Sequence, residues 1–296
     1  MASIKDISRR IASVKNTRKT TKAMEMVAGA RLRRAQARIE ALRPYAERVM
    51  ELMQEVASCT DCAREFPLLE VRDEIKAVSI VMLTGDRGLA GAFNANILRR
   101  GLTLAGDFKA EGKQVSWVVI GKKGVGTMRF RGYELADATQ GITDRPTFGD
   151  ASAVARRIAD MYESGETDEV HLVYNHFKSP VEQKVTDQIL LPLGMELVET
   201  QPVPEEQRKL KGDFIFEPSS TAILSQLLPT YIDITIYRAL LESTASEHGA
   251  RMTAMRNASE NAEEMVEKLT LEMNKARQAS ITQEILEVVA GAEALA

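Results

Sequence analysis

The chain has 296 residues, a mass of 32.7 kDa and a formal net charge of −3. Hydrophobic residues make up 44% and charged residues 27%, which excludes a disordered tail. No window approaches the ~20 apolar residues that a membrane-spanning helix needs. The start lacks the apolar core of a secretory signal, and the two cysteines, Cys59 and Cys62, give no disulfide framework.

Glycine and charge both divide the chain into three parts. Fifteen of the 18 glycines lie between Gly85 and Gly212, which indicates a turn-rich middle between two helical ends. Residues 1–50 hold 13 basic and 4 acidic side chains, a net charge of +9. Residues 219–296 hold 6 basic and 11 acidic side chains, a net charge of −5. Opposite charges favour pairing of the two ends in space.

The first predicted element is a long helix within residues 1–60. From Ile4 to Val56, steps of alternately three and four residues give sixteen positions, of which thirteen are apolar. Such a pattern predicts the seam of a coiled coil held over seven heptads. The three polar positions are consecutive: Arg18, Thr21 and Glu25. The sequence leaves open whether the helix loosens there or another element replaces its partner.

The middle, residues 75–195, alternates predicted strands with predicted helices. Apolar runs predict strands at 76–83, 115–120 and 169–175, with 185–191 as a fourth candidate. Predicted helices follow the turns at 84–94 and 121–126, and another covers 150–164. This alternation predicts a mostly parallel, Rossmann-like α/β domain with helices on both faces of the sheet.

Two glycine turns in this domain invite comparison with phosphate-binding loops. The first contains Gly85, Gly88 and Gly91, and the second runs from Gly121 to Gly126. Neither has the G-x-G-x-x-G order of dinucleotide-binding folds or the G-x-x-x-x-G-K-[ST] order of P-loops. Tight strand-to-helix connections that need small residues are the favoured interpretation, with nucleotide binding as the alternative.

The last predicted element is a second long helix within residues 210–296. The same three–four period runs from Leu227 to Ala276, and the apolar positions then shift to Ile281 and Ile285. At 1.5 Å per residue this helix would be roughly 105 Å long and the first roughly 80 Å. The sequence therefore predicts an antiparallel coiled coil that projects from the α/β domain, with the longer helix unpaired at its tip.

Catalytic and metal-binding patterns are absent from the sequence. The only histidines are His171, His176 and His248, and none belongs to a hydrolase or metalloprotease motif. Cys59 and Cys62 form a single C-x-x-C pair, which alone cannot close a four-ligand zinc site. We therefore predict no active site, no cofactor and no metal; a redox or metal role for the cysteines is the alternative.

Three stretches resemble the gamma subunit of F-type ATP synthases, bacterial type. They are Ile11–Ala28, Asp86–Asn94 and the segment from Asn274 through Ile281-Thr282-x-Glu284 to Gly291-Ala292. The resemblance covers essentially the whole chain. It implies a non-catalytic central-stalk rotor shaft that couples proton-driven rotation of the c ring to conformational change at the three beta catalytic sites.

The resemblance also implies partners and contact residues. The partners would be three alpha and three beta subunits, the epsilon subunit and the c-subunit ring, at the cytoplasmic face of the bacterial inner membrane. The positions that match family contacts to the beta subunits are Met24, Arg251, Gln278, Thr282 and Glu284. Phe214 and Glu217 fall in a segment that looks like the part of the foot that meets the c ring.

The basic first segment allows a hypothesis about mechanism and supports one rival function. Its positive charge could transmit torque by attracting acidic loops of beta subunits; a solvated helix face is the simpler interpretation. A coiled-coil tether or nucleic-acid-binding protein with a structural α/β domain is the first alternative function, although aromatic residues are scarce. A nucleotide-dependent α/β enzyme with helical arms is the second.

Overall fold

The computed structural model describes residues 4–57, 66–70, 72, 74–179, 182–193 and 220–293. The chain divides into two compact units. The helix-pair unit comprises residues 1–29 and 251–296, and the α/β unit comprises residues 30–250. Two helices, α1 (Ile4–Ala57) and α7 (Ser220–Glu293), contribute to both units. The long helices predicted at the two ends of the sequence are confirmed.

The α/β unit contains a five-stranded sheet in the order β3-β2-β1-β4-β5. Its first four strands are parallel, and β5 runs antiparallel to β4. The bounds are β1 (Ala77–Leu83), β2 (Gln114–Ile120), β3 (Asp137–Thr139), β4 (Glu169–Phe177) and β5 (Gln183–Leu191). The predicted mostly parallel sheet is confirmed. The three-residue strand β3 was not predicted, because so short a segment shows no apolar pattern.

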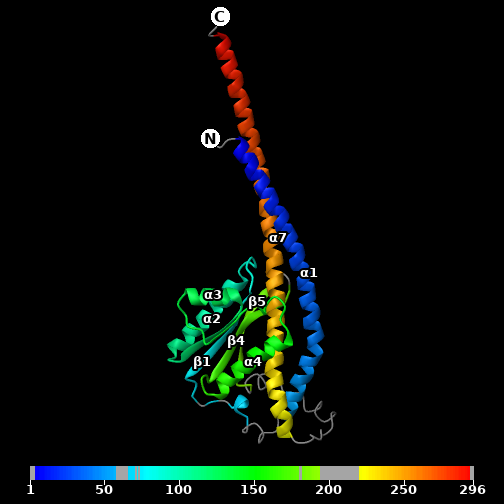
Figure 1. Ribbon diagram of the computed structural model, residues 1–296, viewed down its shortest axis with the longest axis vertical. Coiled ribbons are helices and arrows are strands. Elements are labelled where there is room, and N and C mark those ends of the chain that lie inside the picture. Colours follow the sequence, from blue (N-terminus) through cyan, green and yellow to red (C-terminus); the bar gives the residue numbers. More distant parts are fainter. Residues whose placement is uncertain are drawn as a thin grey trace. The chain divides into compact units, whose positions relative to one another are not determined.

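Helices cover both faces of this sheet (Figure 1). On one face lie α2 (Phe93–Ala110) and α3 (Lys122–Phe130), packed on Ile80 and Met82 of β1. On the other face lie α4 (Phe148–Glu163) and parts of α1 and α7, packed on Val81 and Leu83. A short 3₁₀ helix, η2 (Pro67–Leu69), completes this second layer. Alternate residues of β1 face opposite layers because side chains in a strand alternate in direction.

A stretch of α7 inside the α/β unit is polar and yet buried. The hydroxyl of Ser243 donates to the carbonyl oxygen of Leu83 at 3.4 Å, and that of Ser246 donates to the carbonyl oxygen of Asn175 at 3.1 Å. Both carbonyls belong to strands β1 and β4. Small hydroxyl side chains allow the helix to approach the sheet closely while its buried polar groups stay hydrogen-bonded.

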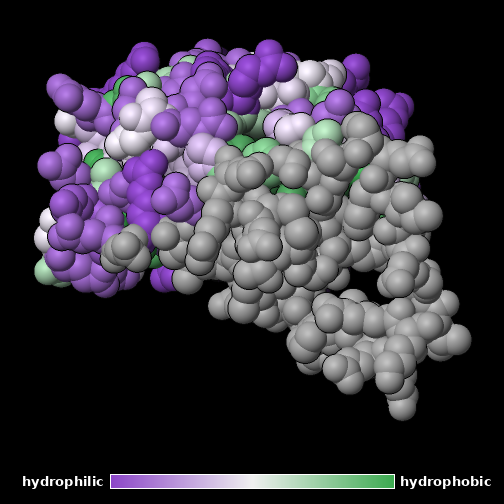
Figure 2. Space-filling view, turned by 90° about the horizontal axis from the view of Figure 1, so that it is seen from below, coloured by the Kyte–Doolittle hydropathy of each residue, from purple (hydrophilic) through white to green (hydrophobic). Residues whose placement is uncertain are grey.

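One face of the described surface is mainly hydrophilic (Figure 2). In the view from below, most of the coloured atoms belong to hydrophilic residues (Figure 2). The strand residues that build the core are closed to solvent, for example Val78 and Val173 at 0% exposure. Within the described ranges, no helix combines the length and the apolar character that crossing a bilayer requires.

Candidate interaction surfaces of the helix pair

In the helix-pair unit, α1 and α7 run antiparallel. A Cβ atom added to Gly29 would lie 3.3 Å from the sulfur of Met252, so the backbones approach closely there. At the other end of the pair, Ile4 and Met273 line the same shallow depression. The buried apolar residues of this seam are Ile7, Ile11, Ala28, Met255 and Ala262. The predicted antiparallel coiled coil is confirmed for this unit.

The polar positions of the seam meet polar partners on α7. The hydroxyls of Thr21 and Ser259 lie 2.6 Å apart and are both buried. Arg256 Nε donates to Glu25 Oε1 at 3.2 Å. Because α1 stays helical and α7 stays its neighbour, neither alternative that the sequence left open is correct. The interruption is a layer of matched polar residues rather than a loosened helix or a replaced partner.

Glu25 is the most buried charged group of this polar layer, with 8% exposure. The hydrogen bond from Lys22 at 3.0 Å holds the pKa of Glu25 below its ordinary value; burial raises that pKa, and Arg256 lowers it further. Arg18 extends the layer through an ion pair of 2.8 Å to Glu263, in which both side chains are about half exposed. Polar groups at a seam position fix the register of a helix pair at some cost in stability.

Replacing Glu25 by alanine should destabilise the helix pair by about 1–2 kcal/mol, because Arg256 and Lys22 lose a mostly buried acceptor. The matched control is Glu260→Ala, an exposed position on α7 where a change within about 0.5 kcal/mol is expected. Urea denaturation at pH 7, followed by circular dichroism, measures both. Equal effects of the two substitutions would show that the polar layer contributes nothing specific.

One exposed face of α1 carries four cations: Lys15, Arg18, Lys19 and Lys22. Two of them already have partners within the unit, since Arg18 pairs with Glu263 and Lys22 with Glu25. Lys15 and Lys19 form no ion pair with any residue that the structure describes. The charge available to a partner is therefore smaller than the sequence count suggests, although the face remains positive.

Next to these cations, α1 exposes an apolar group. Met24 is 39% exposed, Met26 63% and Val27 54%. Met24, a contact residue in the sequence prediction, is therefore accessible to a partner. Arg251, predicted on the same grounds, lies on α7 and is half-buried. Its contact with a partner stays a prediction.

The last part of α7 is an exposed helix with apolar residues on its surface. The start of α1 lies beside Met273 and Arg277, and α7 continues to Glu293. Beyond that point every residue from 281 to 290 is exposed. The large apolar side chains among them are Ile281 (49% exposed), Ile285 (57%), Leu286 (62%), Val288 (72%) and Val289 (50%). This set is called the apolar tip below.

Three predicted contact residues, Gln278, Thr282 and Glu284, are exposed on the last part of α7. The hydroxyl of Thr282 donates to the carbonyl oxygen of Gln278 at 3.0 Å, and the hydroxyl of Ser280 donates to Glu284 Oε1 at 3.4 Å. Both bonds are local to α7, so the three side chains remain open to solvent. Their contacts with beta subunits stay predictions.

Other predicted residues fall outside the described part of the chain. Phe214 and Glu217, predicted to meet the c ring, lie between the described ranges, as do Cys59 and Cys62. Their predicted roles therefore stay predictions.

In the two glycine turns of the α/β unit, atoms of the chain itself occupy the space beside Gly85 and Gly121. A Cβ atom at Gly85 would lie 2.8 Å from the carboxylate of Glu247, and one at Gly121 would overlap the carbonyl oxygen of Thr84. A carboxylate against the first turn disfavours a phosphate in the same place. Both turns are close-packed connections, which supports the interpretation that the sequence favoured.

Two of the three histidines lie within hydrogen-bond distance of a glutamate. His171 Nε2 lies 2.7 Å from Glu169 Oε1, and both side chains are more than nine-tenths buried. His176 Nδ1 lies 2.6 Å from Glu242 Oε2. No group of three or more metal-ligating side chains occurs among the described residues.

Sequence reasoning missed the role of Asp86. Its Oδ1 accepts hydrogen bonds from the backbone N–H groups of Lys122 and Gly141, each at 2.9 Å. Its Oδ2 accepts from the N–H of Thr143 at 3.0 Å and from the hydroxyl of Thr143 at 2.8 Å. Burial raises the pKa of Asp86, but these four hydrogen bonds outweigh it and hold the pKa below its ordinary value. Asp86 therefore anchors the loop 140–147.

Sequence comparison places the chain beside a well-populated group of proteins. Residues 3–295 match the ATP synthase family. The ATP synthase gamma chain of Rubrobacter xylanophilus is 45% identical, with 100% of this chain and 99% of the relative covered. The ATP synthase gamma chain of Desulforamulus reducens is 44% identical over 100% of both chains.

Structural comparison gives similar proteins at lower identity. A chain of the central stalk and c-ring structure of Tetrahymena thermophila mitochondrial ATP synthase superposes with a TM-score of 0.59 and 27% identity, covering 81% of this chain and 99% of that chain. A chain of the Euglena gracilis mitochondrial ATP synthase rotor gives a TM-score of 0.64 at 18% identity, covering 94% and 98%. At 18% identity, the similarity to the Euglena chain shows only that the two chains share a fold.

Proposed function

Because the chain belongs to the family of ATP synthase gamma chains, we propose that it is the shaft of the central stalk. It couples proton-driven rotation of the c ring to conformational change at the three beta catalytic sites. The full-length relatives and the central-stalk structure support this role. They do not favour the alternative of a coiled-coil tether or nucleic-acid-binding protein.

The observation that carries the proposal is the apolar tip. An exposed helix with five large apolar residues at least 49% exposed needs a surrounding surface to remove them from water. A ring of alpha and beta subunits around the tip would supply that surface. Because a continuous helix pair with a fixed register resists bending and slipping, the chain can transmit torque to such a sleeve.

The specific partners extend this proposal. Three alpha and three beta subunits would surround the helix pair, and the epsilon subunit and the c-subunit ring would contact the foot. Met24, Gln278, Thr282 and Glu284 are accessible for contacts with beta subunits. The chain would be held at the cytoplasmic face of the bacterial inner membrane through the complex.

The chain is proposed to be non-catalytic, with ATP chemistry confined to its partners. His171 and His176 each lie within hydrogen-bond distance of a glutamate, and the chain's own atoms fill the space beside Gly85 and Gly121. In the proposed role these groups stabilise the fold.

The direct test is isolation of the assembled complex from cells in which this chain carries an affinity tag. The expected material has ATPase activity and contains alpha and beta chains at three copies each for every copy of this chain, together with epsilon. Recovery of the tagged chain by itself, or with nucleic acid that salt removes, would contradict the proposal.

Charge neutralisation tests the proposed torque contribution of α1. Replacing Lys15, Arg18, Lys19 and Lys22 together by glutamine should lower proton-driven ATP synthesis several-fold, because surface charge steers and holds acidic partner loops. Membrane vesicles carrying the assembled enzyme allow the measurement.

The control for this variant removes the same charge from exposed positions of the α/β unit: Arg99, Lys109, Arg129 and Arg131. ATP synthesis in that variant should match the wild type. Unchanged synthesis in the α1 variant would reject the charge hypothesis and leave the shaft proposal intact.

A further inference from the structure

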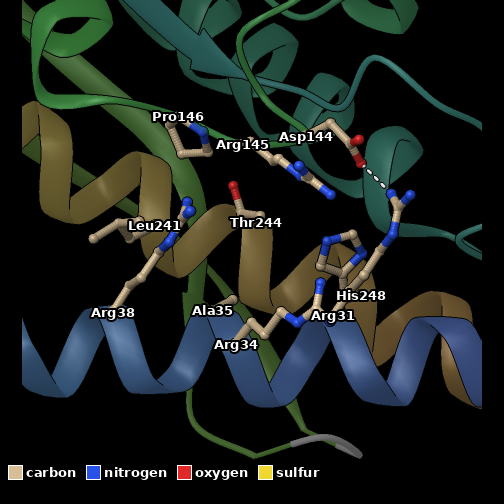
Figure 3. Close-up of a pocket in the computed structure, with 10 residues that line it drawn as sticks. All are labelled: Arg31, Arg34, Ala35, Arg38, Asp144, Arg145, Pro146, Leu241, Thr244 and His248. Carbon is tan, nitrogen blue, oxygen red and sulfur yellow. Dashed lines mark hydrogen bonds and ion pairs between the residues drawn. The ribbon is translucent and has the colours of Figure 1, made fainter.

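A cavity of about 50 Å³ in the α/β unit is lined by four arginines. Arg31, Arg34 and Arg38 come from α1, and Arg145 comes from the loop after β3 (Figure 3). The three residues of α1 are spaced by three and four positions, which places them on one face of the helix. The cavity lies between this face, α7 and the loop.

The cavity has an excess of positive charge. The only carboxylate that lines it, among the described residues, is that of Asp144. Asp144 is already shared: its Oδ1 lies 2.6 Å from Arg31 and its Oδ2 lies 3.4 Å from Arg87. Arg34, Arg38 and Arg145 form no ion pair with any residue in the described ranges. One negative charge therefore faces four guanidinium groups.

The floor of the cavity is buried, whereas Arg34, Arg38 and Arg145 around it are exposed. Leu241 is 1% exposed, Thr244 5% and His248 2%. Figure 3 shows the side chains of Arg34 and Arg38 reaching from α1 toward α7, while Arg145 reaches down from the loop. Charges held against a buried wall interact more strongly with a ligand than charges in open water.

The loop that carries Asp144 and Arg145 is also held in place. Asp86 binds the backbone of Gly141 and Thr143, and the hydroxyl of Thr244 donates to the carbonyl oxygen of Thr143 at 2.9 Å. The backbone of this loop is therefore ordered before any ligand arrives, which lowers the entropic cost of binding.

We propose that this cavity binds one small tetrahedral oxyanion of the orthophosphate or sulfate class. Guanidinium groups present planar pairs of N–H donors that match the oxygens of phosphate and sulfate. The cavity volume of about 50 Å³ suits a single such group. Binding of orthophosphate here would make the shaft responsive to the phosphate concentration, separately from the coupling role proposed above.

The test is isothermal titration of the full-length chain with sodium phosphate and with sodium sulfate, at constant ionic strength held by sodium chloride. Saturable binding of one anion per chain is expected. Arg34→Gln and Arg38→Gln should each raise the dissociation constant about tenfold or more, because each loses a charged hydrogen bond. Arg38→Lys keeps the charge without the planar fork and should give a smaller increase.

The matched control is Arg33→Gln, an exposed arginine of α1 that does not line the cavity. It should bind phosphate as the wild type does.

Titration with ATP tests whether the site takes a free anion or the phosphate groups of a nucleotide. If the ligand is free phosphate, ATP should bind this site more weakly than phosphate or not at all. Absence of saturable phosphate binding, binding of ATP alone, or equal effects of Arg33→Gln and Arg34→Gln would each overturn the proposal. Far-UV circular dichroism verifies that every variant is folded.

Discussion

Replacing Gly121 by alanine is expected to destabilise the α/β unit by about 3 kcal/mol or more. Gly121 joins β2 to α3 with a φ of +101°, a conformation that residues with a Cβ atom rarely adopt. The added Cβ would also overlap the backbone carbonyl of Thr84, which cannot move without displacing the end of β1. Backbone strain and overpacking contribute about 1–3 kcal/mol each.

Gly126 provides the control for this prediction. It lies inside α3, and nothing stands within 4 Å of a Cβ atom placed there. Gly126→Ala should therefore stabilise the helix by up to about 1 kcal/mol, because alanine loses less backbone freedom than glycine. Urea denaturation gives the free energy of unfolding of both variants. A Gly121→Ala protein as stable as the wild type would show that the β2–α3 turn relaxes freely.

The elements that the sequence predicted well are those with long periodic patterns. The seam of α1 and the apolar runs of β1, β2 and β4 can be recognised in the sequence. Burial of one face produces a periodic apolar pattern, and burial of both faces produces a continuous apolar run. The start of α4 was placed too late, at residue 150. Thr147 and Asp150 form a capping box there, so the signal for the correct start was present in the sequence.

The partners of polar residues could not be predicted. Thr21 and Ser259 are 238 positions apart, and only the register of the helix pair brings their hydroxyls together. The same applies to the arginine-lined cavity. The spacing of Arg31, Arg34 and Arg38 indicates a basic helix face, but nothing in the sequence places Arg145 opposite it. Contacts of high sequence separation depend on packing that local patterns do not encode.

Some features of the candidate contact surfaces could be predicted from the sequence and others could not. The apolar tip follows from the sequence pattern, since the C-terminal helix was predicted to outlast its partner. The sequence did not predict how many basic residues of α1 are paired with acids. Glu263, which pairs with Arg18, lies on the other helix. The roles of Met24 and Arg251 rest on the family, and exposure alone does not assign a partner to either.

Replacing Asp86 by alanine is expected to lower the free energy of unfolding by about 2–4 kcal/mol. Three backbone N–H groups and one hydroxyl lose their acceptor at once, in a partly buried place. Each unsatisfied group costs about 1–3 kcal/mol, less where water can enter. The control Glu134→Ala removes an exposed carboxylate and should change stability by less than about 0.5 kcal/mol.

The pH dependence of stability shows whether the stabilising effect of Asp86 depends on its negative charge. Its pKa in the folded chain is held below the ordinary value of 3.8, so its stabilising contribution is complete above about pH 4 and is lost as the pH falls through the lower folded pKa. The difference in stability between wild type and Asp86→Ala should therefore shrink as the pH is lowered below 4. A difference that stays constant down to pH 2 would mean that the anchor does not depend on ionisation.

The same substitution connects the anchor to the oxyanion cavity. Asp86 does not line the cavity, yet it holds the loop that carries Arg145. Asp86→Ala should weaken phosphate binding several-fold under conditions where circular dichroism shows a folded chain, because the loop that carries Arg145 loses its anchor. Asp86→Asn retains an oxygen acceptor and should keep more of the affinity. Equal phosphate affinity in the wild type and Asp86→Ala would mean that the α1 arginines alone hold the anion.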